Sequence, residues 1–159
     1  MLLYTESFRM DNPNPKENFM IDSTSKAPIE STERQPLKKI LIVEDDIDIL
    51  LLLTIFLKEN GYEVEGTLNG IEASRRISRF KPDLIVMDIF LSGTNGRDIC
   101  MSLKNSDETR AIPIILISSD EQDKAELEII KADEFINKPF QINYLLSKIK
   151  EHLDQRMAA

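Results

Sequence analysis

Short apolar runs that end in acidic or hydroxyl side chains recur along the sequence from Lys38 onward and alternate with longer amphipathic stretches. The runs are rich in β-branched residues and lack the polar alternation of a strand with one wet face, so they predict strands buried on both sides. Five runs are visible, at residues 40–43, 62–67, 84–88, 114–117 and 135–136. The alternation therefore predicts an α/β fold in which helices cover a parallel sheet.

The amphipathic stretches carry helix signals at their ends. Asp46 and Asn69 stand where N-caps are expected, and Gly61 and Pro82 stand where a helix must stop. The predicted helices cover about residues 46–60, 70–81, 97–104, a stretch that starts at 120, and 141–153. Residues 92–96 between them are predicted to form a turn.

We expect one folded domain over residues 37–155. Residues 1–36 hold four of the seven prolines and show neither a strand nor a helix period, which predicts a flexible N-terminal tail. Residues 156–159 are predicted to be a short C-terminal tail. Because so little sequence follows the last predicted helix, we expect a stand-alone domain without an output domain.

Composition excludes several classes of function. The net charge of −8 argues against direct binding to nucleic acid, whose phosphates require clustered Lys and Arg. One cysteine and one histidine are too few for a Cys/His zinc site, and a lone cysteine is typical of a reducing compartment. The N-terminal segment lacks the apolar stretch that a signal peptide or membrane span needs. We therefore expect a cytoplasmic protein that does not bind membranes.

Polar residues collect where the predicted strands end. They are Glu44, Asp45, Asp46, Asp88, Ser118 and Lys138. The carboxyl ends of parallel strands meet at one edge of a sheet, so these side chains are expected to converge there. Gathered carboxylates repel one another unless a cation joins them, and their oxygens favour Mg²⁺. A carboxylate beside a metal ion, a lysine and a hydroxyl is suited to phosphoryl transfer.

Four ordered motifs carry a resemblance to a known family. They are Ile-Leu-Ile-Val-Glu-Asp-Asp (40–46), Leu-Ile-Val-Met-Asp-Ile-Phe-Leu-Ser-Gly-Thr-Asn-Gly (84–96), Ile-Pro-Ile-Ile-Leu-Ile-Ser-Ser (112–119) and Phe-Ile-Asn-Lys-Pro-Phe (135–140). Together the motifs resemble the receiver domain of two-component response regulators, over about residues 38–153. The resemblance implies a flavodoxin-like (βα)5 fold, with a parallel sheet of order 2-1-3-4-5 and helices on both faces.

The resemblance also implies roles for the polar residues. Asp88 matches the phosphoacceptor, and Lys138 matches the lysine that pairs with the phosphoryl group. Asp45 matches a direct Mg²⁺ ligand, Glu44 matches the acid that helps to hold the ion, and the backbone carbonyl of Phe90 matches the remaining protein ligand. Mg²⁺ is the implied cofactor.

Further positions match the switch and the residues that set phosphoryl lifetime. Ser118 and Phe135 match the hydroxyl and the aromatic residue that change position on phosphorylation. The side chains of Phe90 and Asp120 match positions that flank the path of hydrolytic water, and bulky Phe90 is expected to shield the acyl phosphate. Ser92 departs from the family pattern, which usually has proline there.

The implied function is that of a phosphoacceptor signalling protein and not an enzyme, since it catalyses only its own phosphorylation and slow autodephosphorylation. A sensor histidine kinase or a histidine phosphotransfer protein is the implied donor. A partner protein would read a conformational change, and a homodimer could form through the fourth helix, fifth strand and fifth helix. The alternatives are a scaffold that binds without phosphorylation and an aspartyl-phosphate hydrolase, which lacks a second aspartate two residues after Asp88.

Three features have a structural alternative. Acids after a strand are often helix caps, and Asp46 is assigned to that role. Phe135 could belong to the core without any switching role. The helix at 46–60 is apolar almost all round, which indicates either burial or an outer face that docks the phosphodonor.

Overall fold

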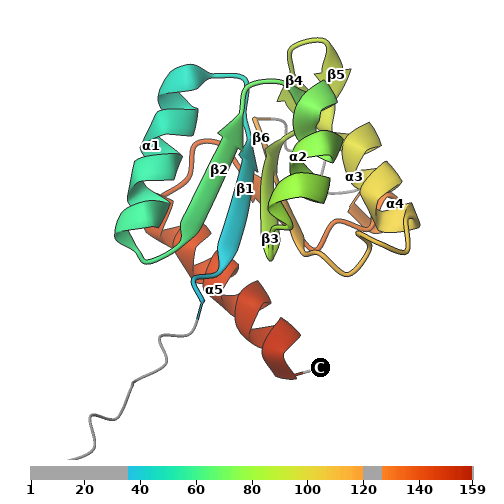
Figure 1. Cartoon of the computed structure of the whole chain (residues 1–159). Coiled ribbons are helices and arrows are strands. Elements are labelled where there is room, and N and C mark those ends of the chain that lie inside the picture. The colour runs from blue at the N-terminus through green and yellow to red at the C-terminus, as the bar shows by residue number, and fades with distance from the viewer. Residues whose placement is uncertain (1–35, 120–126, 159) are drawn as a thin grey trace, which may run out of the picture. The chain divides into compact units, whose positions relative to one another are not determined.

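The computed structural model describes residues 36–119 and 127–158, in which strands and helices alternate along the chain (Figure 1). The strands are β1 (Lys39–Val43), β2 (Glu63–Thr67), β3 (Leu84–Asp88), β4 (Phe90–Leu91), β5 (Thr94–Asn95), β6 (Ile114–Ser118) and β7 (Glu134–Asn137). The helices are α1 (Ile47–Glu59), a 3-10 turn η1 (Gly70–Glu72), α2 (Ala73–Phe80), α3 (Gly96–Asn105), α4 (Leu127–Ile130) and α5 (Ile142–Ala158). The predicted N-terminal tail and the predicted helix start at Asp120 lie outside the described residues, apart from Pro36.

Five of the strands form one parallel sheet in the order β2-β1-β3-β6-β7. Numbered among themselves, these strands have the order 2-1-3-4-5, so the predicted flavodoxin-like topology is confirmed. The chain order reverses at β1 and β3, and ligand sites of open α/β sheets form beyond the carboxyl ends of the strands at such a point.

Helices cover both faces of the sheet, as Figure 1 shows. In β1, Ile40 and Ile42 face one core, which includes residues of α1 and α5, whereas Leu41 and Val43 face the other, which includes residues of α2, α3 and α4. Both sets of side chains are therefore buried, which explains why the strand is an unbroken apolar run.

The predicted caps are present. Oδ1 of Asp46 accepts hydrogen bonds from the backbone N–H groups of Asp48 (2.8 Å) and Ile49 (3.2 Å), so Asp46 starts α1. The side chain of Asn69 accepts from the N–H of Ile71 (2.8 Å), although this cap opens η1 rather than α2 itself. The Asp46 side chain therefore caps the helix, and Glu44 and Asp45 are the acids after β1 that can contribute to a site at the edge of the sheet.

Residues 90–95 contain a small hairpin that the sequence pattern did not predict. β4 and β5 pair antiparallel around Ser92 and Gly93, and Gly93 takes a φ of +81° that favours glycine. The N–H of Gly96 then donates to the carbonyl of Ile89 (2.8 Å). A Cβ at Gly96 would lie 2.3 Å from the carbonyl oxygen of Asp88, so this close approach requires glycine.

The last helix differs from its predicted bounds. α5 continues to Ala158, whereas the sequence pattern ended the helix at Leu153, the last apolar residue of its buried stripe. Residues 156–158, predicted as a tail, therefore have helical backbone. Residues 154–158 include no Gly or Pro, so nothing in the local sequence stops the helix there.

Candidate functional site

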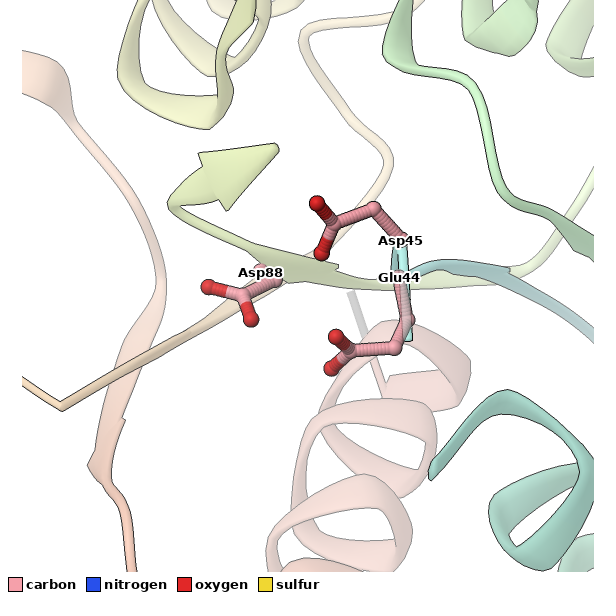
Figure 2. A group of neighbouring side chains, drawn as sticks. All are labelled: Glu44, Asp45 and Asp88. Atoms are coloured by element: carbon pink, nitrogen blue, oxygen red, sulfur yellow. The ribbon is translucent and has the colours of Figure 1, made fainter. Parts of the chain in front are cut away.

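Three carboxylates meet at the carboxyl edge of the sheet. Glu44 and Asp45 directly follow β1, and Asp88 ends the neighbouring strand β3. Each of the three offers a carboxylate oxygen, and these oxygens all lie within 4.8 Å of one another (Figure 2). Glu44 and Asp88 are buried and Asp45 is half-buried. The structure thus brings together the acids that the sequence predicted to converge.

Lys138 supplies a cation to this cluster from the end of the edge strand β7. It follows β7 directly, and its ammonium donates to Oε2 of Glu44 (2.9 Å) and to Oδ2 of Asp88. The backbone N–H of Lys138 also donates to the carbonyl of Ser118 at the end of β6 (2.6 Å). The predicted lysine and the predicted hydroxyl residue are therefore neighbours at the same edge.

The electrostatics of the pocket reflect its excess of negative charge. Burial raises the pKa of Glu44, and the charge of Asp88 raises it further, while the hydrogen bond from Lys138 opposes both effects. Burial alone would lower the pKa of Lys138, but its hydrogen bonds to Asp88 and Glu44 raise it above the ordinary value. Lys138 thus stays an ammonium, and one such cation does not balance three carboxylates.

The donor set fits a small divalent cation. The three carboxylates provide hard oxygen ligands from two adjacent strand ends, and such ligands suit Mg²⁺. The chemistry of the residues therefore agrees with a Mg²⁺ site at Glu44, Asp45 and Asp88.

Phe90 lies directly beside the acidic pocket. Its backbone N–H donates to Oδ1 of Asp88 (2.9 Å), which fixes the orientation of that carboxylate. Phe90 is 49% exposed, and the guanidinium of Arg97 lies over its ring, 5.8 Å from the ring centre. The side chain therefore stands next to the acceptor without entering the core.

Ser118 and Phe135 lie on the two strands at the other side of Asp88. Ser118 is fully buried at the end of β6, and Asp88 pairs in register with its neighbour Ile117. Phe135 pairs with Leu116 and is 5% exposed, within the core that includes α3. The ring points into the core. This position agrees with a purely structural role for Phe135 and also with a role in the switch. Asp120 lies outside the described residues.

Two residues of this region were not identified from the sequence as part of the site. Ser92 donates from its backbone N–H and its hydroxyl to Asp45, and Gly96 lets α3 start against the backbone of Asp88. The departure of Ser92 from the family pattern was visible, but its contact with Asp45 depends on the unpredicted hairpin. A surface cavity of about 300 Å³ between Asp45 and this hairpin opens beside the acids.

An acidic pocket with a half-buried lysine at the switch point of a flavodoxin-like sheet defines the class of protein, and the comparisons identify the family. The family model of the response regulator receiver domain matches residues 40–150. Protein PilG of Pseudomonas aeruginosa is 30% identical over 117 residues, which cover 72% of this chain and 87% of that protein. The chain therefore belongs to the response regulator receiver domain family, and it is a receiver domain of two-component signalling.

Other relatives are longer proteins. The phosphate regulon transcriptional regulatory protein PhoB of Rhizobium meliloti is 34% identical over 119 residues, which cover 74% of this chain and 52% of PhoB. The DNA-binding dual master transcriptional regulator RpaA of a Synechocystis strain is 31% identical, with 70% of this chain and 47% of RpaA covered. The chain thus spans about half the length of these two relatives.

Solved structures give the same assignment. The receiver domain of a signal transduction histidine kinase from Syntrophus aciditrophicus is 38% identical, with a TM-score of 0.69 over 74% of this chain and 91% of that one. The response regulator TrrA from Thermotoga maritima, solved with Mg²⁺ and BeF, is 30% identical, with a TM-score of 0.67 over 73% of this chain and 98% of that one. Within the described residues, none of the helices has the length and apolar character to cross a membrane.

Proposed function

We propose that Asp88 accepts a phosphoryl group from a phosphohistidine donor and that Glu44, Asp45, Asp88 and the carbonyl of Phe90 hold the Mg²⁺ ion that the reaction needs. The observation that carries this proposal is the convergence of the three carboxylates within 4.8 Å, with Lys138 bonded to two of them. When bound, Mg²⁺ would neutralise charge on the acceptor and on the phosphoryl oxygens.

The chain's own residues would orient the acceptor and stabilise the transferred group. The hydrogen bond from the N–H of Phe90 holds one oxygen of Asp88 and thereby orients the carboxylate. In the transfer, an oxygen of Asp88 bonds to phosphorus, the bond from phosphorus to the donor imidazole breaks, and its electron pair returns to the imidazole nitrogen. Lys138 would turn from the carboxylates to a phosphoryl oxygen.

Ser118 and Phe135 are the proposed switch. The hydroxyl of Ser118 would move toward the phosphoryl oxygens, and Phe135 would respond one strand further out. Support comes from the strand order, since β6 carries Ser118 beside β3 and pairs with β7, which carries Phe135. A partner protein, or a second copy of the chain, would read the change on the surface of α4, β7 and α5.

The donor is proposed to dock on the outer face of α1. Leu51, Leu52 and Ile55 are each more than half exposed, although they are large apolar side chains. Leu52 also borders an apolar cavity of about 300 Å³ that reaches Lys138. Leu53, the next residue of α1, is 2% exposed and belongs to the core, so it is not part of this exposed face.

Leu52→Glu tests the docking proposal. We expect slower phosphoryl transfer from a histidine phosphotransfer domain and an unchanged rate with acetyl phosphate, which needs no docking surface. Ile71→Glu is the matched control, since Ile71 is an exposed isoleucine of η1. Equal rates for Leu52→Glu and the parent chain with the protein donor would contradict the proposal.

The proposal also covers the donor, the compartment and the bounds of the domain. A sensor histidine kinase or a histidine phosphotransfer protein is the proposed donor, and the action is placed in the cytoplasm, which agrees with a single cysteine and a net charge of −8. The receiver domain is proposed to begin at residue 37 after a tail over residues 1–36, in agreement with a family match that begins at residue 40.

Acetyl phosphate with Mg²⁺ tests the central proposal. Mass spectrometry of the full chain should show the added mass of one phosphate, labile in base, and the adduct should be lost in Asp88→Asn and without Mg²⁺. A chain that gains no phosphate from acetyl phosphate or from a phosphorylated kinase would instead be a scaffold that binds its partner without phosphorylation.

A further inference from the structure

One oxygen of Asp45 receives two hydrogen bonds from Ser92. The backbone N–H of Ser92 donates to Oδ2 of Asp45 at 2.9 Å, and the Ser92 hydroxyl donates to the same oxygen at 2.6 Å. The second distance is short, as expected for a hydroxyl that donates to a charged carboxylate. Ser92 and Asp45 are 47 residues apart in the chain, so this contact depends on the fold alone.

The backbone around Ser92 is held in place independently of Asp45. Ser92 lies in the turn of the β4–β5 hairpin, whose strands pair Phe90 with Asn95 and Leu91 with Thr94. The N–H of Gly96 donates to the carbonyl of Ile89, which ties the end of the hairpin to the residue after Asp88. The hairpin follows β3, the strand that ends in Asp88, and presents Ser92 to Asp45.

We infer that Ser92 is a positioning residue that orients the Asp45 carboxylate for a divalent cation. Both donors bind Oδ2, so Oδ1 receives no hydrogen bond from Ser92 and can face the pocket shared with Glu44 and Asp88. Hydrogen bonds to the second oxygen of a ligating carboxylate fix its direction and raise metal affinity. The inference rests on the proposed function, because it takes Asp45 to be a metal ligand.

Two other roles of Ser92 would give different measured results. If Ser92 instead held Asp45 away from the cation, removing the hydroxyl would tighten binding of Mg²⁺. A serine that served only to stabilise the hairpin would alter the free energy of unfolding without a specific effect on the metal. Metal affinity and stability must therefore be measured on the same variants.

The experiment is calorimetric titration of the full chain with MgCl₂, with urea unfolding in EDTA as the second readout. Ser92→Ala removes the hydroxyl and keeps the N–H, so we expect a roughly tenfold weaker Kd for Mg²⁺, the low end of the range for such partners because Ser92 is exposed. Ser92→Thr keeps a hydroxyl and should restore the parent affinity. Ser78→Ala, which removes an exposed hydroxyl in α2, should leave Kd unchanged.

Each outcome of these measurements either supports or overturns the positioning role of Ser92. A tenfold loss in Ser92→Ala, rescue by Ser92→Thr and equal stabilities in EDTA support the inference. An unchanged or tighter Kd in Ser92→Ala overturns it, as does a loss that follows reduced stability in EDTA. If the parent chain binds no Mg²⁺, or if Asp45→Asn binds it as well as the parent, the proposed metal site fails and the inference falls with it.

Discussion

The ammonium of Lys138 lies 2.9 Å from Oε2 of Glu44, although 94 residues separate the two along the chain. The same ammonium contacts Asp88, and both acids are buried. Lys138→Met would leave two buried carboxylates without their cation, so we expect the free energy of unfolding at pH 7 to fall by about 2–3 kcal/mol. Urea unfolding in EDTA measures this loss. Lys150→Met, at an exposed position of α5, is the control, and equal stabilities of the two variants would contradict the prediction.

The ring of Phe90 and the guanidinium of Arg97 form a second testable pair, 5.8 Å apart. If the ring shields the proposed acyl phosphate from water, Phe90→Ala should shorten the half-life of the phosphorylated chain roughly three- to tenfold, a change of about 0.7–1.4 kcal/mol in the barrier. Arg97→Met should give a smaller effect in the same direction, because it removes the cation that lies over the ring. The decay of phosphate-labelled chain measures both half-lives.

Met101→Ala provides the control for these two variants, since Met101 is a partly exposed apolar residue of the same helix as Arg97. Its phosphorylated form should decay at the parent rate. A parent-like half-life for Phe90→Ala would remove the shielding role.

The ion pair between Lys104 and Asp133 should matter more than the surface pairs. Lys104 is nearly buried, with its ammonium 2.5 Å from Oδ2 of Asp133 and 2.9 Å from the carbonyl of Ile112. Oδ2 of Asp133 also accepts the N–H of Ile114 (2.7 Å). Asp133→Ala should cost about 2 kcal/mol, below the value for a fully buried pair because Asp133 is one-third exposed.

Asp107→Ala is the matched control, since Asp107 pairs with Arg110 at the surface and should contribute no more than about 0.5 kcal/mol. Denaturation midpoints of the two variants can be compared directly. Similar midpoints would show that the Lys104 pair adds nothing beyond a surface contact.

Glu134 should contribute to the acid sensitivity of the fold. Burial alone would raise its pKa, but the hydrogen bonds from Lys148 (2.9 Å) and from the N–H of Phe135 (3.3 Å) lower it below the ordinary 4.5. A lowered pKa in the folded state means that the stabilisation is complete above the unfolded-state value and is lost as the pH falls through the folded-state value. The contribution at pH 7 should be at most about 1 kcal/mol, because the group is partly exposed.

Glu134→Gln should therefore lose stability at pH 7 and show a shallower decline in stability from about pH 5 downward than the parent chain. Urea unfolding across this pH range gives the two profiles. Glu108→Gln, an exposed residue without this contact, should follow the parent profile. Parallel profiles for Glu134→Gln and the parent would contradict the assignment.

Local sequence was sufficient for the five strands of the main sheet and for the convergence of Glu44, Asp45, Asp88 and Lys138 at one edge. The unbroken run of β1 predicted a strand covered on both faces, and the acids after β1 and β3 predicted a cation site, because parallel strands end at one edge. Asp46 was recognisable as a cap from its position before an apolar helix. These features depend on neighbours in the chain, so the sequence expresses them directly.

Local sequence was insufficient where a feature depends on distant atoms. The hairpin of β4 and β5 is too short to leave an alternating pattern, and the need for glycine at position 96 arises from the backbone of Asp88. Leu52 and Leu53 look alike in the sequence, yet one is exposed and the other is buried. The end of α5 was misplaced because the apolar stripe stops before the helix does.

The sequence by itself determined the order of the strands and helices around the main sheet and the charged residues at the strand ends, since period, caps and strand-end residues are local properties of the chain. The tertiary structure decided which groups touch. The bonds of Lys138 to Glu44 and Asp88, and those of Ser92 to Asp45, join residues that are 94, 50 and 47 positions apart. Contacts at such separations exist only once the strands have paired in register, so no local pattern can encode them.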